Sequence, residues 1–257
     1  MLEIVKETLK QFDSDLKEIL NHNYLDIILY GSNVLNDFTP HYGDIDFIVV
    51  LNGDLSDSSI QDIYNLHGIY RSKKYNNLEY QLEGVYYPKI ALKDIHKEFI
   101  GCYIGTGRKG WKKIIKFQNS FFDLIQIKSK GICYRNGTYE MYIPNENEIN
   151  NSIIEETYML KKLLDENKIP LYHIIQFVAR TLYYLETKTI GSKTESCKKY
   201  SEKNGNNEII EKCGKIKMPY NYREFEEKYP ELNQIAKQSL NELMEIMNII
   251  KKDQNCT

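Results

Sequence analysis

The sequence predicts an α/β N-terminal domain, with a mixed sheet and flanking helices, followed by a C-terminal all-α helical bundle. In the first half of the chain, short runs of apolar and β-branched residues alternate with segments of helical periodicity. Beyond about residue 150, apolar residues recur at steps of three and four. A polar run at residues 144–148 separates the two patterns, so we expect domains at residues 1–150 and 151–257.

The elements of the first half follow from the spacing of the apolar residues. Steps of three and four predict helices at residues 2–20, 58–64 and 111–117. Apolar runs bounded by turn residues predict strands at residues 25–30, 44–50, 78–87 and 131–135. Pro88 closes the third strand, because proline cannot donate a hydrogen bond to a sheet. Strand and helix therefore alternate in this half.

The second half is expected to be helical throughout. Helical periodicity covers residues 153–167, 172–187 and 233–251. Between the last two, Ser192-Lys193-Thr194-Glu195 matches the capping-box pattern and predicts another helix start. Such a series of amphipathic helices predicts a bundle.

Composition excludes several classes of partner. The chain has 257 residues and a formal net charge of −2, which gives no general attraction for nucleic acid. No segment approaches the roughly 18 consecutive apolar residues of a membrane span, and the N-terminus lacks an apolar leader. The five cysteines form no Cys-x-x-Cys pair, so neither a disulfide framework nor a zinc site is indicated. We expect a cytoplasmic protein without a nucleic-acid or membrane partner.

The most informative motif is Gly31-Ser32 followed by Asp44-Ile45-Asp46. Because strand side chains alternate, Asp44 and Asp46 should point to the same face, where two carboxylates can share magnesium. The backbone N–H groups of Gly31 and Ser32, with the Ser32 hydroxyl, are suited to hold phosphates. A phosphate turn beside two metal-binding acids is typical of nucleotidyl transfer, in which Asp44 and Asp46 would be catalytic.

A third carboxylate is expected to act as general base near the acceptor hydroxyl. Glu79 and Glu83 share a face of the strand predicted at residues 78–87, and either could reach the pair of aspartates. The residues alone do not choose between them.

The motif resembles a known family. Leu29-Tyr30-Gly31-Ser32, Pro40 and Asp44-Ile45-Asp46 with the apolar run that follows are similar to the N-terminal domain of aminoglycoside adenylyltransferases of the streptomycin and spectinomycin type, in the polymerase-β-like nucleotidyltransferase superfamily. The resemblance implies an antibiotic-resistance enzyme that needs magnesium. Its reaction would transfer AMP from ATP to a hydroxyl of an aminoglycoside and release pyrophosphate. It also implies a helical C-terminal domain that closes on ATP and the drug.

The resemblance also assigns residues. Leu82-Glu83-Gly84 matches the strand that carries the family's third carboxylate, which favours Glu83 over Glu79 as base. The stretches 177–182 and 190–193 are similar to those where the family places an arginine and a lysine near the nucleotide. Arg180 and Lys193 are therefore expected to bind ATP.

Other interpretations remain open for the acceptor. The chain could be a nucleotidyltransferase for another small molecule, such as a lincosamide, or for a protein hydroxyl, and it could be a catalytically silent nucleotide-binding module. The run Gly105-Thr106-Gly107-Arg108-Lys109-Gly110 has the spacing of a dinucleotide fingerprint, but no convincing βαβ unit with the expected acid follows it. We interpret this run as a loop.

Overall fold

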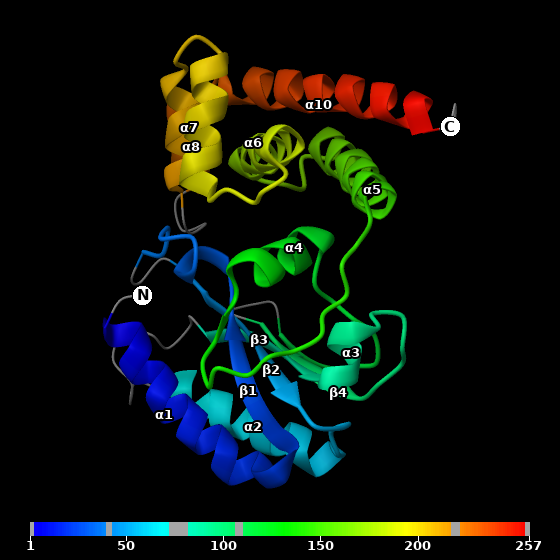
Figure 1. Ribbon diagram of the computed structural model, residues 1–257. Coiled ribbons are helices and arrows are strands. Elements are labelled where there is room, and N and C mark those ends of the chain that lie inside the picture. The colour runs from blue at the N-terminus through cyan, green and yellow to red at the C-terminus, as the bar shows by residue number, and fades with distance from the viewer. Residues whose placement is uncertain (1–2, 40–42, 72–81, 106–109, 217–221, 255–257) are drawn as a thin grey trace. The chain divides into compact units, whose positions relative to one another are not determined.

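A computed structural model describes residues 3–39, 43–71, 82–105, 110–216 and 222–254 (Figure 1). The chain divides into two compact units, Met1–Ile143 and Pro144–Thr257. The expected boundary between residues 150 and 151 falls inside helix α5 (Glu146–Asp165). That helix begins in the polar run expected as a linker, because the Asn145 side chain accepts a hydrogen bond from the N–H of Glu148 and caps it.

The first unit is built on a mixed sheet with the strand order β5-β4-β3-β2-β1-β6. Its strands are β1 (Tyr24–Leu29), β2 (Ile45–Leu51), β3 (Leu82–Pro88), β4 (Gly101–Ile104), β5 (Trp111–Ile114) and β6 (Ile132–Cys133). Strands β2 and β3 pair in parallel, and the other neighbours pair antiparallel. The parallel pair lies in the middle of the sheet, with both faces covered.

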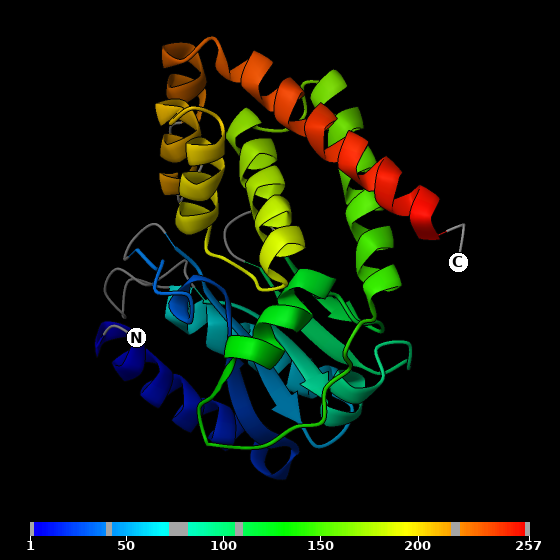
Figure 2. The same cartoon turned by 45° about the horizontal axis from the view of Figure 1, so that its top comes forward.

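Helices lie on both faces of this sheet (Figure 2). They are α1 (Glu3–Leu20), α2 (Asp57–Arg71), α3 (Lys89–Lys93) and α4 (Phe121–Lys130), and short 3-10 turns occupy Asn21–Asn23 and Gly31–Asn33. In β2, Phe47 and Val49 face α1 and α2, whereas Ile48 and Val50 face α3 and α4. The continuous apolar run of β2 follows from this burial on both faces.

One expected element of this unit is wrong. Residues 111–117 were predicted as a helix, but Trp111–Ile114 form strand β5, paired with β4. The Trp111 ring packs against Tyr64 and His67 of α2, at centroid distances of 5.3 and 6.4 Å. These contacts join segments distant in sequence, and the periodicity of so short a run does not reveal them. Of the strand predicted at 78–87, residues 78–81 lie outside the described part.

The second unit is helical in its described part, as predicted. Its helices are α5, α6 (Leu171–Thr187), α7 (Lys193–Lys203), α8 (Glu208–Lys215), α9 (Tyr222–Lys228) and α10 (Leu232–Gln254). Helix α6 contacts α5, α7, α8 and α10. The buried Gln176 amide of α6 donates to the carbonyl of Cys213 at 2.7 Å and to that of Ile216 at 3.1 Å, which satisfies the end of α8.

Within the described residues, no helix combines the length and the apolar composition needed to cross a membrane.

His67 lies in an aromatic part of the core between α1, α2 and the sheet. Its side chain is 1% exposed, and Nε2 is 2.8 Å from the Tyr86 hydroxyl. The rings of Phe12 and Phe47 lie against it at centroid distances of 5.3 and 6.1 Å. Burial, with a smaller contribution from the charge of Arg71, lowers the pKa of His67 to about 3.

This histidine should make the stability of the first unit depend on pH. As pH falls below about 6.5, the unfolded chain binds a proton that folded His67 excludes, so the free energy of unfolding should fall by up to about 1.4 kcal/mol per pH unit. The loss should continue until the pH reaches the folded pKa. We expect His67→Gln to remove this component between pH 7 and pH 5, in urea unfolding followed by the fluorescence of Trp111, the only tryptophan.

His22→Gln is the matched control, because His22 is exposed. It should leave the pH dependence of the wild type in place. An unchanged pH dependence in His67→Gln would show that His67 is not held neutral by burial.

Candidate active site

The turn after β1 is held from two sides. The N–H of Tyr30 donates to the carbonyl of Asp46 at 3.1 Å, which continues the pairing of β1 with β2 by one residue. The chain then enters the 3-10 turn Gly31–Asn33 with Gly31 at φ +71°. On the other side, the buried Gln126 amide of α4 donates to the Gly31 carbonyl at 2.9 Å. As the first residues of a helical turn, Gly31 and Ser32 have N–H groups without a partner inside that turn.

Gly31 lies directly against a carboxylate. A Cβ atom added to Gly31 would be 1.9 Å from Oδ2 of Asp46 and 2.9 Å from its Cβ. The positive φ also disfavours any residue with a side chain. Glycine is therefore required at this point, and its backbone forms one wall beside Asp46.

The paired strands bring a second carboxylate to the same place. Asp46 and Glu83 are register partners across the parallel pair β2–β3. Along their strands, both alternate in step with the residues that face α3 and α4. Their side chains therefore leave the sheet on that face. Asp44 lies one residue before β2, and its carbonyl accepts a hydrogen bond from the Asn33 amide at 3.3 Å. The side chains of all three acids are half-buried.

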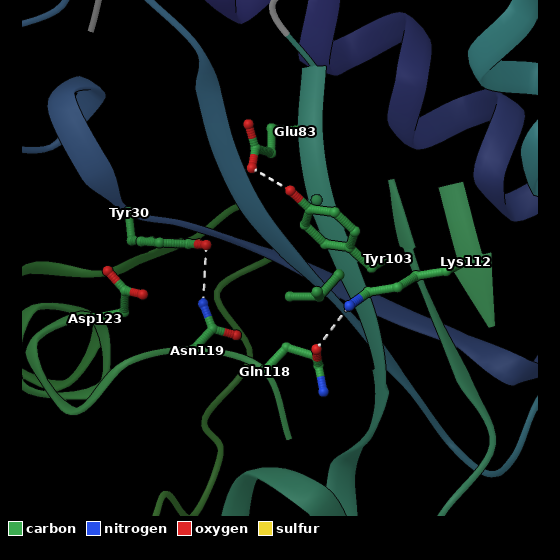
Figure 3. Close-up of a pocket in the computed structure, with 9 residues that line it drawn as sticks. Tyr30, Glu83, Tyr103, Lys112, Gln118, Asn119 and Asp123 are labelled. Carbon is green, nitrogen blue, oxygen red and sulfur yellow. Dashed lines mark hydrogen bonds between the residues drawn. The ribbon is translucent and has the colours of Figure 1, made fainter. Parts of the chain in front are cut away.

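Tyr103 connects the three acids electrostatically. Its hydroxyl, on β4, donates to Oε1 of Glu83 at 2.6 Å (Figure 3). Burial raises the pKa of Tyr103, and the hydrogen bond to Glu83 and the negative charges of Glu83, Asp44 and Asp46 raise it further. The charges of Asp44, Asp46 and Glu83 therefore all act on one phenol, and their joint role in a catalytic site stays a prediction.

A pocket of about 420 Å³ adjoins Glu83. It is lined by Tyr30, Glu83, Gly84, Val85, Tyr103, Lys112, Gln118, Asn119 and Asp123 (Figure 3). The Asn119 amide donates to the Tyr30 hydroxyl at 2.9 Å and accepts from the Tyr87 hydroxyl at 3.1 Å. The wall opposite Tyr103 is thus fixed by a network of neutral hydrogen bonds.

Comparison with known proteins agrees with this geometry. Residues 9–120 match the family model described as a nucleotidyltransferase domain. The chain is also similar in fold to spectinomycin adenyltransferase AAD(9) from Enterococcus faecialis, in a structure with ATP and spectinomycin. The TM-score is 0.63 and the identity 17%, over 95% of this chain and 99% of that one. The search of curated proteins gave no match.

The predicted fold class is therefore confirmed. The N-terminal region has a mixed sheet with flanking helices, and a largely helical portion follows it, as in the adenyltransferase fold. At 17% identity, the likeness to AAD(9) describes the fold and leaves the acceptor as a prediction.

The donor set of the domain fits magnesium with help from a substrate. Within the described residues, no group of three or more His, Cys, Asp or Glu side chains is arranged to hold a metal ion by itself. Magnesium is usually bound by one or two carboxylates together with substrate phosphates and water. Asp44 and Asp46 can supply such carboxylates, and Gly31 lets the backbone of the turn lie directly against the Asp46 carboxylate.

Two other predicted residues, Arg180 and Lys193, belong to the second unit. Arg180 is half-buried on α6, and Lys193 is the first residue of α7. The Ser192 side chain caps that helix by accepting from the N–H of Glu195 at 3.1 Å, as its sequence pattern predicted. The assignment of Arg180 and Lys193 to the nucleotide stays a prediction.

Several pocket residues were missed by the sequence analysis. Tyr103 and Asn119 carry no motif of their own, and only the strand pairing and the chain path bring them to Glu83. Asp123 had a detectable signal, because Ser120 and Asp123 form a capping box at the start of α4. Glu79, Pro40 and residues 106–109 lie outside the described residues.

The contact between Gly31 and Asp46 can be tested by adding one methyl group. Gly31→Ala should destabilise the first unit for two reasons: its φ of +71° costs about 1–2 kcal/mol with a side chain, and the Cβ would overlap the Asp46 carboxylate. Gly110→Ala is the matched control, since Gly110 has a φ of +75° and no atom within 4 Å of its added Cβ.

We expect Gly31→Ala to cost about 1–3 kcal/mol more than Gly110→Ala in urea unfolding, because only the first variant adds a steric overlap. Equal decreases in the free energy of unfolding for the two variants would mean that the added Cβ at Gly31 does not overlap the Asp46 carboxylate.

Proposed function

We propose that the protein transfers AMP from ATP to a hydroxyl of an aminoglycoside and releases pyrophosphate, with magnesium as cofactor. The observation that carries this proposal is the grouping of Asp44, Asp46 and Glu83 beside the Gly31 turn within a nucleotidyltransferase domain. Nucleotidyl transfer needs neutralised phosphate charge, an aligned attack and a base for the acceptor proton. Each need has a candidate group in this arrangement.

In the proposed reaction, the acceptor oxygen attacks the α-phosphorus of ATP. A bond forms between that oxygen and phosphorus, and the bond to the oxygen that bridges the α- and β-phosphates breaks. Pyrophosphate leaves with the electron pair, and the acceptor proton passes to the Glu83 carboxylate. The Tyr103 hydroxyl, 2.6 Å from Oε1 of Glu83, holds the carboxylate in position.

The triphosphate is proposed to bind at the turn. The N–H groups of Gly31 and Ser32, with the Ser32 hydroxyl, would hold phosphate oxygens. Arg180 and Lys193 would add positive charge from the second unit. Asp44 and Asp46 would hold magnesium, which when bound neutralises phosphate charge and favours departure of pyrophosphate.

An aminoglycoside acceptor is supported by two observations. The protein of similar fold, AAD(9), is a spectinomycin adenyltransferase whose structure contains ATP and spectinomycin. The candidate site also presents several carboxylates, which favour a positively charged acceptor over a neutral or anionic one. A small acceptor fits a pocket of about 420 Å³, which is within the usual range for small-molecule sites.

Transfer of label from ATP tests this function directly. With α-labelled ATP and magnesium, the wild type should label spectinomycin or streptomycin and release pyrophosphate. Asp46→Asn should reduce the labelling to background and keep the fluorescence of folded Trp111, because the amide lacks the charge that binds magnesium. Labelled lincosamide or labelled protein would replace the aminoglycoside as acceptor, and absence of any transfer would refute the enzymatic function.

The choice of base can be tested with a matched pair of variants. Glu83→Gln should lower kcat by about 10²-fold or more, because the amide cannot take the acceptor proton. Glu79→Gln makes the same chemical change nearby in the chain and should have a small effect. Comparable losses in the two variants would overturn the assignment of Glu83 as base.

A further inference from the structure

The pocket beside Glu83 carries a second carboxylate in its lining, that of Asp123 at the start of α4 (Figure 3). One Asp123 oxygen, Oδ2, accepts from the N–H of Ser120 at 3.0 Å in the capping box. After burial, the charge of Asp123 is the next cause that raises the pKa of Tyr30, and that of Asp46 follows. The negative charges of Asp123 and Asp46 therefore both act on Tyr30.

Lys112, the cationic side chain of this lining, has polar and aromatic contacts within the pocket. Lys112 donates to Oε1 of Gln118 at 3.0 Å and lies 5.5 Å from the centre of the Tyr103 ring. The Asn119 amide is used on both sides by Tyr30 and Tyr87. Of the lining side chains, Glu83 and Asp123 are the anionic ones, and they lie on β3 and α4 respectively.

We propose that this pocket is the acceptor subsite and that Asp123 binds a protonated amine of the acceptor, while the hydroxyl to be adenylated faces Glu83. The proposal rests on the proposed function and narrows the substrate class to cyclic amino alcohols that carry an amine on the side opposite the reacting hydroxyl. A carboxylate that binds an ammonium group makes a charge-assisted hydrogen bond, stronger than the neutral bonds of the phenols and amides around it. Asp123 is thus the specificity-determining residue of the pocket.

The test separates the charge of Asp123 from its structural role. Asp123→Asn removes the charge, and its amide oxygen can still accept from the N–H of Ser120. Ser120→Ala is the matched control, because it breaks the other half of the capping box, the 3.1 Å bond from the N–H of Asp123, and keeps the carboxylate. Folding of both variants is checked by the fluorescence of Trp111 and by circular dichroism.

The probes are spectinomycin and its N-acetylated derivative, in which the amines are neutral. We expect Asp123→Asn to raise the KM for spectinomycin about tenfold or more and to leave the KM for ATP unchanged. For the N-acetylated compound, wild type and Asp123→Asn should have the same KM. Ser120→Ala should lower the melting temperature without raising the KM for spectinomycin. An unchanged KM in Asp123→Asn, or an equal rise with both probes, overturns the proposal.

Failure of the proposed function gives a different result, in which the wild type labels no aminoglycoside. The subsite is then judged by calorimetric titration of the full chain with spectinomycin in the absence of ATP. Binding that is weakened in Asp123→Asn and kept in Ser120→Ala supports it. Absence of binding to the wild type, or equal binding to all three proteins, overturns it.

Discussion

The parallel pairing of β2 with β3 is the constraint on which the candidate site depends. Neighbouring strands lie about 4.8 Å apart, so register partners carry side chains that leave the same face as close neighbours. The register pairs Asp46 with Glu83, and a shift by one residue would send one carboxylate to the opposite face. Parallel strands need a long connection, and here it includes α2, which packs on the face away from the acids.

Bringing like charges together raises the energy of the empty site. The half-exposed side chains of Asp44, Asp46 and Glu83 keep some hydration, and the Tyr103 hydroxyl donates to Glu83. What remains is a concentrated negative charge beside backbone N–H groups that attract anions. Such a site favours a ligand that carries cations next to phosphates, so the same electrostatics support both the proposed nucleotide and the proposed cationic acceptor.

The parts of this site that lie close in sequence could be predicted. Gly31 and the two aspartates fall within one strand-turn-strand segment, where strand alternation predicts the facing of Asp46 inside β2, and Asp44 lies one residue before that strand. Strand alternation does not distinguish Glu79 from Glu83, because residues an even number of positions apart face the same side of a strand. The family resemblance was needed to favour Glu83 as the base. Tyr103 could not be predicted as a site residue from the sequence, because its position depends on the pairing of β3 with β4. The helix predicted at residues 111–117 was wrong for the same reason: pairing with a distant strand decided the structure.

One short helix, α4, joins the two halves of the proposed chemistry. Its buried Gln126 holds the Gly31 carbonyl, its first turn carries Asp123 into the pocket, and Asn119 precedes its cap. Ile127 of the same helix is buried in the core on that face of the sheet, so the helix cannot shift without loss of packing. A change in its length or tilt would therefore move the Gly31 turn and the wall of the pocket together.

Side-chain replacements at the pocket surface, in contrast, can alter the proposed acceptor while the turn, Asp46 and Glu83 keep their positions. The groups proposed for nucleotidyl transfer therefore depend on backbone and strand register, whereas the proposed choice of acceptor depends on a few side chains of the pocket.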